Sequence, residues 1–405
     1  MIEDYRKDFP ILQTEMNGKP LAFLDSAASA QKPQAVIDAM TGAMDSHYAN
    51  IHRGLYKLSQ DLTAEYENAR GKVADFIGAP SPTNIVFTRN TTEAINLVAQ
   101  SWGRTFLSEG DEIILSEMEH HANIVPWQLL RDEIGIDIKT IPVRDDGTLD
   151  IEAFEQLLTP RTKLVSVVHI SNSLGTINPV RELIATAKDF YGDMKVLVDG
   201  SQAVVHGPVD VSALDADFYV FTGHKLYAPT GVGVLYGKDE ILQSMPPYQG
   251  GGDMIDRVTF EKTTFREAPY RFEAGTPAII EVIGLGSAID YLRMIGMKEI
   301  ASYEAKLAEY ALSKLKEIDG LRLYGTAADK VGVFSFTIEG TTPADIGMIL
   351  DQGGVAVRAG HHCCMPLMKR FDVEATVRAS LGLYSNKTDI DQLIAGLEKA
   401  KDMLL

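Results

Sequence analysis

The sequence is poor in cysteine and in long apolar runs. Its 405 residues include 2 cysteines and 2 tryptophans, too few cysteines for a disulfide framework or for spaced zinc-binding pairs. No apolar run reaches the ~20 residues that span a bilayer. Residues 1–10 carry charges from the third residue on and lack the apolar core of a signal peptide. We therefore expect a soluble, cytoplasmic protein with no membrane partner.

Positive charge is also in short supply. Lysine plus arginine total 38 against 56 for aspartate plus glutamate, a net charge of −18. This balance argues against nucleic acid or an anionic membrane as a partner. Apolar residues make up 45% of the chain, enough for one large core and a smaller one. We expect two domains, a large one over 21–296 and a small one from 1–20 plus 297–405.

Strand patterns alternate with helical patterns up to Gly296. Several of the strand patterns are nearly continuous apolar runs, which are typical of a mainly parallel sheet covered on both faces. This predicts a doubly wound α/β fold, with ligands at the carboxyl ends of the strands. Shorter links between the later strands favour a mixed sheet at that end. The expected strands are 85–88, 112–116, 139–143, 164–170, 195–199, 218–222 and 231–236, with helices at 92–102 and 180–190.

The pattern changes after Gly296. Apolar residues follow helical spacing over 300–318, alternate as a strand over 333–338, and mark a final amphipathic helix over 390–404. These elements predict a smaller α+β domain. The N-terminal residues are too few to fold alone, so we expect them to pack on this domain.

Asp199 and Lys225 follow the apolar runs 196–198 and 218–221. Pyridoxal phosphate (PLP) needs a lysine amine that holds its aldehyde as a Schiff base, and an acid that keeps its pyridine nitrogen protonated. Either residue alone fits a solvated strand end or a salt bridge equally well. Together they predict a PLP site.

Further polar residues near predicted strand ends suit the other parts of this cofactor. Thr92 lies at a helix start, where hydroxyls and free N–H groups bind anions, although it also fits an ordinary helix cap. Thr222 and His224 flank the lysine and could add phosphate contacts. His120 could stack on the ring and shuttle protons near neutral pH. Gln202 could reach the phenolic oxygen.

The two cysteines are adjacent, Cys363 and Cys364. Neighbouring Cα atoms lie about 3.8 Å apart, below the ~4.4 to 6.8 Å of ordinary disulfides, so we expect two free thiols. Two histidines precede them, but four consecutive residues cannot all converge on one tetrahedral ion, so no metal site is expected. Gly360 and Pro366 nearby favour a loop.

The chain resembles the fold-type I PLP enzymes of the class V aminotransferase group, and specifically the cysteine desulfurases. The motif Arg-x-Gly-His-His-Cys, with its short loop, is similar to the SUF-type (group II) branch. The resemblance covers essentially the whole chain. Its densest matches are 50–54, 119–127, 198–203, 222–225, 273–277, 358–366 and 377–381.

The resemblance implies a role for each candidate residue. Lys225 would be the Schiff-base lysine, Asp199 would bind the pyridine nitrogen, Gln202 the phenolic oxygen, and His120 would stack on the ring. The phosphate would be held by Thr92, Thr222 and His224, with Thr276 contributed across a homodimer interface.

The resemblance also implies the reaction. L-cysteine would be converted to L-alanine while Cys363 takes the sulfur as a persulfide, for delivery to a SufE-like acceptor in iron–sulfur cluster assembly. Arg378 would grip the substrate carboxylate, and Asn172 and Arg358 would line the same pocket. Cys364 departs from the family pattern. It is either a second persulfide carrier or, as we favour, a space-filling residue.

Two other functions stay open. Selenocysteine lyase, cysteine sulfinate desulfinase or aminotransfer would use the same scaffold and depend less on Cys363. A non-catalytic sulfur carrier or scaffold would keep only the fold. Intact Lys225, Asp199, Arg378 and Cys363 argue against that reading, because an idle protein has no need of all four.

Overall fold

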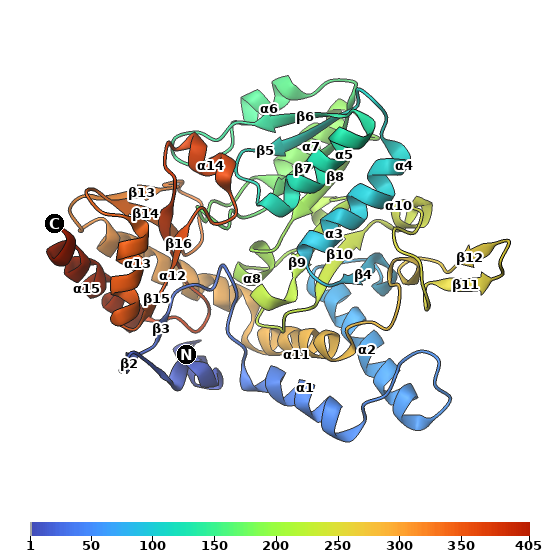
Figure 1. The fold of residues 1–405 in the computed structure, drawn as a ribbon, viewed down its shortest axis with the longest axis horizontal. Coiled ribbons are helices and arrows are strands. Elements are labelled where there is room, and N and C mark those ends of the chain that lie inside the picture. The colour runs from blue at the N-terminus through green and yellow to red at the C-terminus, as the bar shows by residue number, and fades with distance from the viewer. Residues whose placement is uncertain (1) are drawn as a thin grey trace.

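The computed structural model of the chain describes residues 2–405 and consists of a large α/β part and a smaller part that holds both chain ends (Figure 1). Met1, the first residue of the predicted small domain, lies outside the described residues. Within that range no helix combines the length and apolar character needed to cross a membrane.

A seven-stranded sheet with the order β4-β10-β9-β8-β7-β5-β6 forms the centre of the large part. Neighbouring strands are parallel except where β10 pairs antiparallel with both β4 and β9, which confirms the mixed end predicted from the short links. Its strands are β4 Ile85–Thr88, β5 Glu112–Ser116, β6 Asp137–Ile141, β7 Thr162–Val168, β8 Lys195–Asp199, β9 Phe218–Thr222 and β10 Gly233–Gly237.

Two of these strands begin earlier than the apolar pattern predicts. The strands expected at 139–143 and 164–170 begin at Asp137 and Thr162. Both first residues pair with Glu112 at the start of β5. Backbone pairing therefore recruits polar residues that periodicity alone assigns to a loop.

Both faces of the large sheet are buried. In β8, Val196 and Val198 belong to one apolar cluster and Leu197 to another, as the alternation of side chains along a strand requires. The covering helices include α3 Thr91–Leu97, which continues as a π-helical segment Val98–Gly103, and α7 Val180–Phe190, the range expected from the sequence.

The smaller part contains the antiparallel sheet β13-β14-β17-β16 and its own apolar cluster. Near it, β3 Ala22–Phe23 pairs with β15 Val355–Ala356, so the N-terminal chain returns to this part. Its other strands are β13 Leu321–Tyr324, β14 Val333–Ile338, β16 Arg358–Gly360 and β17 Thr376–Ser380, and its helices are α12 Met297–Leu315, α13 Pro343–Gln352, α14 Met365–Arg370 and α15 Lys387–Leu404.

The remaining elements connect and cover these two parts. The hairpin of β11 and β12 projects from the molecule at the right of Figure 1. The longer remaining helices are α1 Gln34–Ser46, α2 Lys57–Phe76, α5 Val125–Ile134, α6 Ile151–Leu157, α10 Asp239–Ser244 and α11 Ile279–Ile295. The short ones are α4 Arg104–Phe106, α8 Ala203–His206 and α9 Val211–Leu214, and the short strands are β1 Glu15–Met16, β2 Lys19–Pro20, β11 Ile255–Val258 and β12 Thr263–Phe265.

Candidate active site

A cavity lies at the carboxyl ends of the parallel strands, where the doubly wound fold predicts a ligand. It brings together most of the candidate residues but not Cys363, which lies beside it, nor Thr276, which lies elsewhere. The candidates that line it are Thr92, His120, Asn172, Asp199, Gln202, Thr222, His224, Lys225, Arg358 and Arg378.

Asp199 ends β8 and is buried. Ser201 donates twice to its Oδ1, from the backbone N–H at 2.9 Å and from the hydroxyl at 2.6 Å. These bonds fix the carboxylate and leave Oδ2 available to a ring N–H. The side-chain Nε2 of Gln202 donates to the Ala27 carbonyl at 2.9 Å and keeps a second N–H for a ligand.

Lys225, His120 and His224 have pKa values that are shifted toward their neutral forms. Burial lowers the pKa of Lys225, and the nearby Arg378 adds to this while Asp199 opposes it. Burial lowers the pKa of His120 to about 3 and that of His224 to about 4, with Lys225 contributing to both. At neutral pH both rings are therefore uncharged, which suits stacking or hydrogen bonding to a bound group.

The start of α3 and the end of β9, which both border the cavity, suit a phosphate. Asn90 caps α3 by accepting the Glu93 N–H at 2.9 Å, so the helix cap does not use Thr92. The buried Thr222 Oγ1 has no hydrogen-bond partner among the described residues. A buried hydroxyl without a partner is costly unless a ligand satisfies it. The residues present therefore fit the anionic end of PLP.

Two arginines face the cavity from neighbouring strands of the small sheet. The antiparallel register of β16 and β17 pairs Arg358 with Arg378. Arg378 is fully buried; its Nη1 donates to the Asn172 carbonyl at 2.9 Å and its Nη2 to Asp25 at 2.8 Å. Its Nε finds no partner in residues 2–405. That edge of the guanidinium is free to bind a carboxylate through two bonds.

Cys363 lies on a strained loop between β16 and α14. His362 and Cys363 have left-handed backbones, with φ of 52° and 59°, which is costly for residues other than glycine. The loop is held by the Cys363 carbonyl, which accepts the His121 N–H at 2.8 Å, and by Asn172, which donates to the His362 carbonyl at 2.9 Å. Cys363 Sγ lies 3.4 Å from Arg358 Nη2.

Both cysteines are free, as the sequence predicts, but their surroundings differ. Cys363 is half-buried. Cys364 is fully buried within an apolar cluster, with its Sγ 3.3 Å from Asn172 Oδ1, and burial raises its pKa to about 12. It is therefore an un-ionised, inaccessible thiol, in keeping with the space-filling role we favour.

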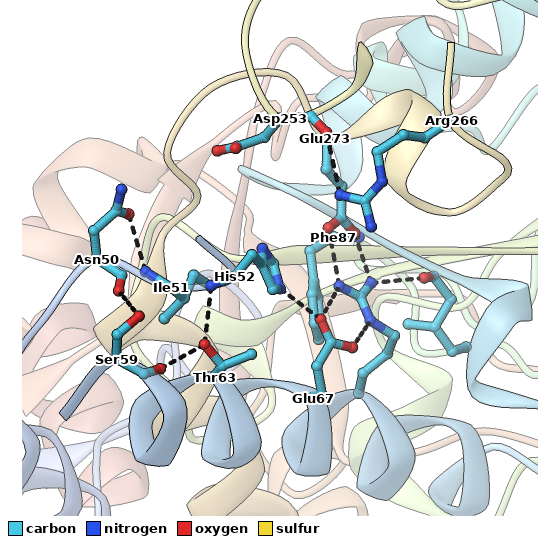
Figure 2. Close-up of polar contacts among 12 residues, drawn as sticks. Asn50, Ile51, His52, Ser59, Thr63, Glu67, Phe87, Asp253, Arg266 and Glu273 are labelled. Carbon is cyan, nitrogen blue, oxygen red and sulfur yellow. Dashed lines mark hydrogen bonds and ion pairs between the residues drawn. The ribbon is translucent and has the colours of Figure 1, made fainter. Parts of the chain in front are cut away.

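Thr276 is exposed and lies on a separate hollow with Arg89 and Glu93. The segment before it is anchored by Glu273, which forms hydrogen bonds of 2.6 and 2.9 Å with the buried Arg70 of α2. Figure 2 shows the neighbouring contacts of this cluster, including the hydrogen bond from His52 to Glu67 at 2.9 Å. His52 of the 50–54 motif lines a small hollow with Gly275 and Pro277, the two neighbours of Thr276, and no residue of the motif lines the candidate cavity.

Three further residues that the sequence pattern does not single out shape the site. Asp25 holds Arg378 from a position 353 residues away in the chain. Ser201 fixes Asp199, and its place two residues after the aspartate was the available signal. The buried Glu119, next to His120 in the chain, accepts hydrogen bonds from Ser116, Asn123 and the Val168 N–H.

Comparison with known proteins agrees with this geometry. The family described as aminotransferase class-V matches residues 22–393. Cysteine desulfurases of Yersinia pestis (strain Pestoides F) and Serratia proteamaculans (strain 568) are each 51% identical to the chain, over 100% of this chain and 99% of theirs.

Solved structures agree as well. The Escherichia coli cysteine desulfurase CsdA superposes with a TM-score of 0.93 at 39% identity, covering 100% of this chain and 99% of that one. The apo cysteine desulfurase of Thermococcus onnurineus NA1 gives 0.94 at 38% identity, covering 99% of this chain and 98% of that one. The chain belongs to the class-V aminotransferase family and, within it, to the cysteine desulfurases.

Proposed function

We propose that this protein is a PLP-dependent cysteine desulfurase, which releases L-alanine from L-cysteine and takes up the sulfur on Cys363. The observation that carries the proposal is the position of Cys363 Sγ, 3.4 Å from an Arg358 nitrogen whose side chain lines the same cavity as Lys225. Sulfur transfer requires a thiol beside the cofactor cavity, whereas aminotransfer has no use for one.

When bound, PLP holds the substrate amine on its aldehyde and withdraws electrons from Cα. In our assignment Lys225 would hold the aldehyde and Asp199 would accept the ring N–H. His120 would stack on the ring and Gln202 would donate to the phenolic oxygen. The phosphate would be held by Thr92, Thr222 and His224, and in a homodimer by Thr276 of the other subunit.

Arg378 positions the substrate. Its unpartnered Nε and the second N–H of Nη2 form the edge that binds a carboxylate through both oxygens. Asn172, whose carbonyl accepts from Arg378 Nη1, borders the same space. Lys225 would move the Cα proton, and its lowered pKa favours the neutral amine that acts as a base.

Cys363 then removes the sulfur. Its thiolate attacks the substrate sulfur, a sulfur–sulfur bond forms, and the carbon–sulfur bond breaks with its electron pair left on carbon, which later takes a proton to give alanine. Arg358 is the cation that lies against this sulfur, with Nη2 at 3.4 Å. His362 carries no charge near neutral pH, because burial, with Arg378 and Arg358 nearby, lowers its pKa to about 3.

The finer assignment follows from the same residues. We place the chain in the SUF-type (group II) branch on the Arg-x-Gly-His-His-Cys motif that begins at Arg358, and with it propose a SufE-like acceptor, iron–sulfur cluster assembly and a cytoplasmic location. A homodimer is supported by the position of Thr276 outside the cavity and by the exposed Leu55 and Phe260, which an interface would cover.

The proposed function is tested by supplying Cys363→Ser protein with two substrates. Alanine release from L-cysteine should fall to background, because the sulfur has no acceptor thiol. Release from L-selenocysteine should persist, because selenium leaves carbon more readily. Cys364→Ser is the matched control and should retain both activities. Undiminished alanine release from L-cysteine by Cys363→Ser protein would exclude Cys363 as the acceptor.

A further inference from the structure

His121, His361 and Cys363 come together beside the cavity. One nitrogen of each ring and the cysteine sulfur all lie within 4.8 Å of one another, and all three side chains are half-buried. The two rings are 5.5 Å apart and tilted by 34°. His121 follows β5, whereas the other two lie in the loop after β16, so the cluster closes only in the folded chain. Neither histidine has a part in the proposed binding of cofactor or substrate.

We propose that these three side chains form a binding site for one divalent cation of the zinc class. Two imidazole nitrogens and a thiolate are ligands that zinc prefers, and three protein ligands leave a fourth position open. Bond lengths of about 2.0 to 2.3 Å place tetrahedral ligands about 3.5 Å apart. The cluster must therefore contract by roughly an ångström, within the reach of one loop movement.

The expectation of no metal site rested on sequence neighbours. His361 to Cys364 cannot all reach one ion, and the structure agrees, because His362 binds Thr376 and Cys364 is buried in an apolar cluster. The missing ligand comes from His121, 240 positions before His361 in the chain.

The ion competes with contacts that hold the loop in place. His121 Nε2 accepts the Met365 N–H at 3.0 Å, and His361 Nδ1 accepts the Cys363 N–H at 3.1 Å. A neutral imidazole has one lone pair, so an ion must displace both hydrogen bonds. It also displaces Arg358 from the sulfur. The hydrogen-bonded loop and the metal-bound loop are thus alternative states, and three metal–ligand bonds outweigh two neutral hydrogen bonds.

The metal-bound state keeps the thiol away from the substrate. This consequence rests on the proposed function, because it treats Cys363 as the sulfur acceptor. Binding itself does not depend on that function. Zinc should therefore act as a reversible block on sulfur uptake and protect the thiol from oxidation or alkylation when no substrate is present.

The experiment is a zinc titration of the holoenzyme by calorimetry in the absence of cysteine. Cys363 alkylation is followed in parallel by mass spectrometry. We expect one zinc per chain and loss of alkylation at saturation. His361→Ala and His121→Gln should each weaken binding by about tenfold or more, and Cys363→Ser should weaken it further. The controls are His47→Gln and Cys364→Ser. They remove a histidine and a thiol that are not part of the three-residue cluster, and both variants should bind zinc as the wild type does.

Two results would overturn the site: no saturable zinc binding by the wild type, or equal affinity in the wild type and His361→Ala. The absorbance of the bound cofactor shows that each variant is folded. An enzyme that binds zinc through these residues but releases no alanine would instead contradict the proposed function and leave the metal site standing.

Discussion

At the residue scale, the site is built from groups whose bonding capacity is incompletely used. Thr222 Oγ1 and Arg378 Nε are buried without partners in the part of the chain that is described. Such groups cost stability in the absence of ligand and add affinity when a ligand satisfies them. These two unpartnered groups indicate that the cavity binds a ligand.

Thr222→Val tests this directly. The change removes a hydroxyl that no protein group uses, so the apoprotein should be as stable as the wild type. Loss of a hydrogen bond to a charged phosphate costs about 1.5 kcal/mol or more, so the apparent dissociation constant for PLP should rise about tenfold. Thr88→Val is the control, because the Thr88 hydroxyl already donates to the Asn90 carbonyl. Unchanged PLP affinity in Thr222→Val would remove Thr222 from the phosphate site.

His362 predicts a pH dependence of stability. Its folded pKa is lowered from 6.5 to about 3, mainly by burial. Between these values His362 is protonated in the unfolded chain but not in the folded chain. The stability that His362 contributes is therefore fully present above pH 6.5 and falls as the pH drops toward 3. The slope from this residue is about 1.4 kcal/mol per pH unit.

His362→Gln should therefore reduce the slope of unfolding free energy against pH by about 1.4 kcal/mol per pH unit between pH 6.5 and 4, which is the contribution of one proton. Denaturant titrations of the two proteins across this range measure the difference. His47→Gln controls for loss of a histidine elsewhere. Parallel curves for wild type and His362→Gln would show that His362 takes up its proton as readily in the folded state as in the unfolded chain.

At the scale of elements, the sequence predicts most of the framework and part of the site. β4, β5, β8, β9, β14 and α7 have the predicted bounds, because continuous apolar runs and clear periodicity define them. Asp199 and Lys225 were found because they follow such strands. Asp25 and the contact between His121 and the Cys363 loop were not, because they depend on tertiary contacts between distant segments, which periodicity does not record.

The buried Arg70 of α2 links that helix to β4 and to the segment that contains Glu273. It binds Glu273 twice, the Ile85 carbonyl once, and lies 4.6 Å from the centre of the Phe87 ring. Arg70→Met leaves a buried carboxylate unpaired and should lower the free energy of unfolding by about 3 to 5 kcal/mol. Adding Glu273→Gln should recover part of this loss. Additive losses in the double variant would mean that the two side chains act independently.

At the scale of the whole molecule, the proposed homodimer gives a prediction of its own. Leu55 is 94% exposed and Phe260 is fully exposed. Leu55→Asp combined with Phe260→Asp should convert a dimer to a monomer in light scattering and weaken PLP binding, because Thr276 no longer reaches a second cavity. Met403→Asp, at an exposed apolar residue near the C-terminus, should leave the assembly intact. A monomeric wild type would refute the shared site.

The assignment of the whole chain as a cysteine desulfurase is tested most directly by its stoichiometry. Wild-type enzyme incubated anaerobically with L-cysteine and no acceptor should release one alanine for each persulfide found on Cys363 by mass spectrometry. Lys225→Ala should give neither product, and Cys363→Ser should give no persulfide. No alanine from the wild type, with or without an added sulfur-carrier protein, would contradict the account.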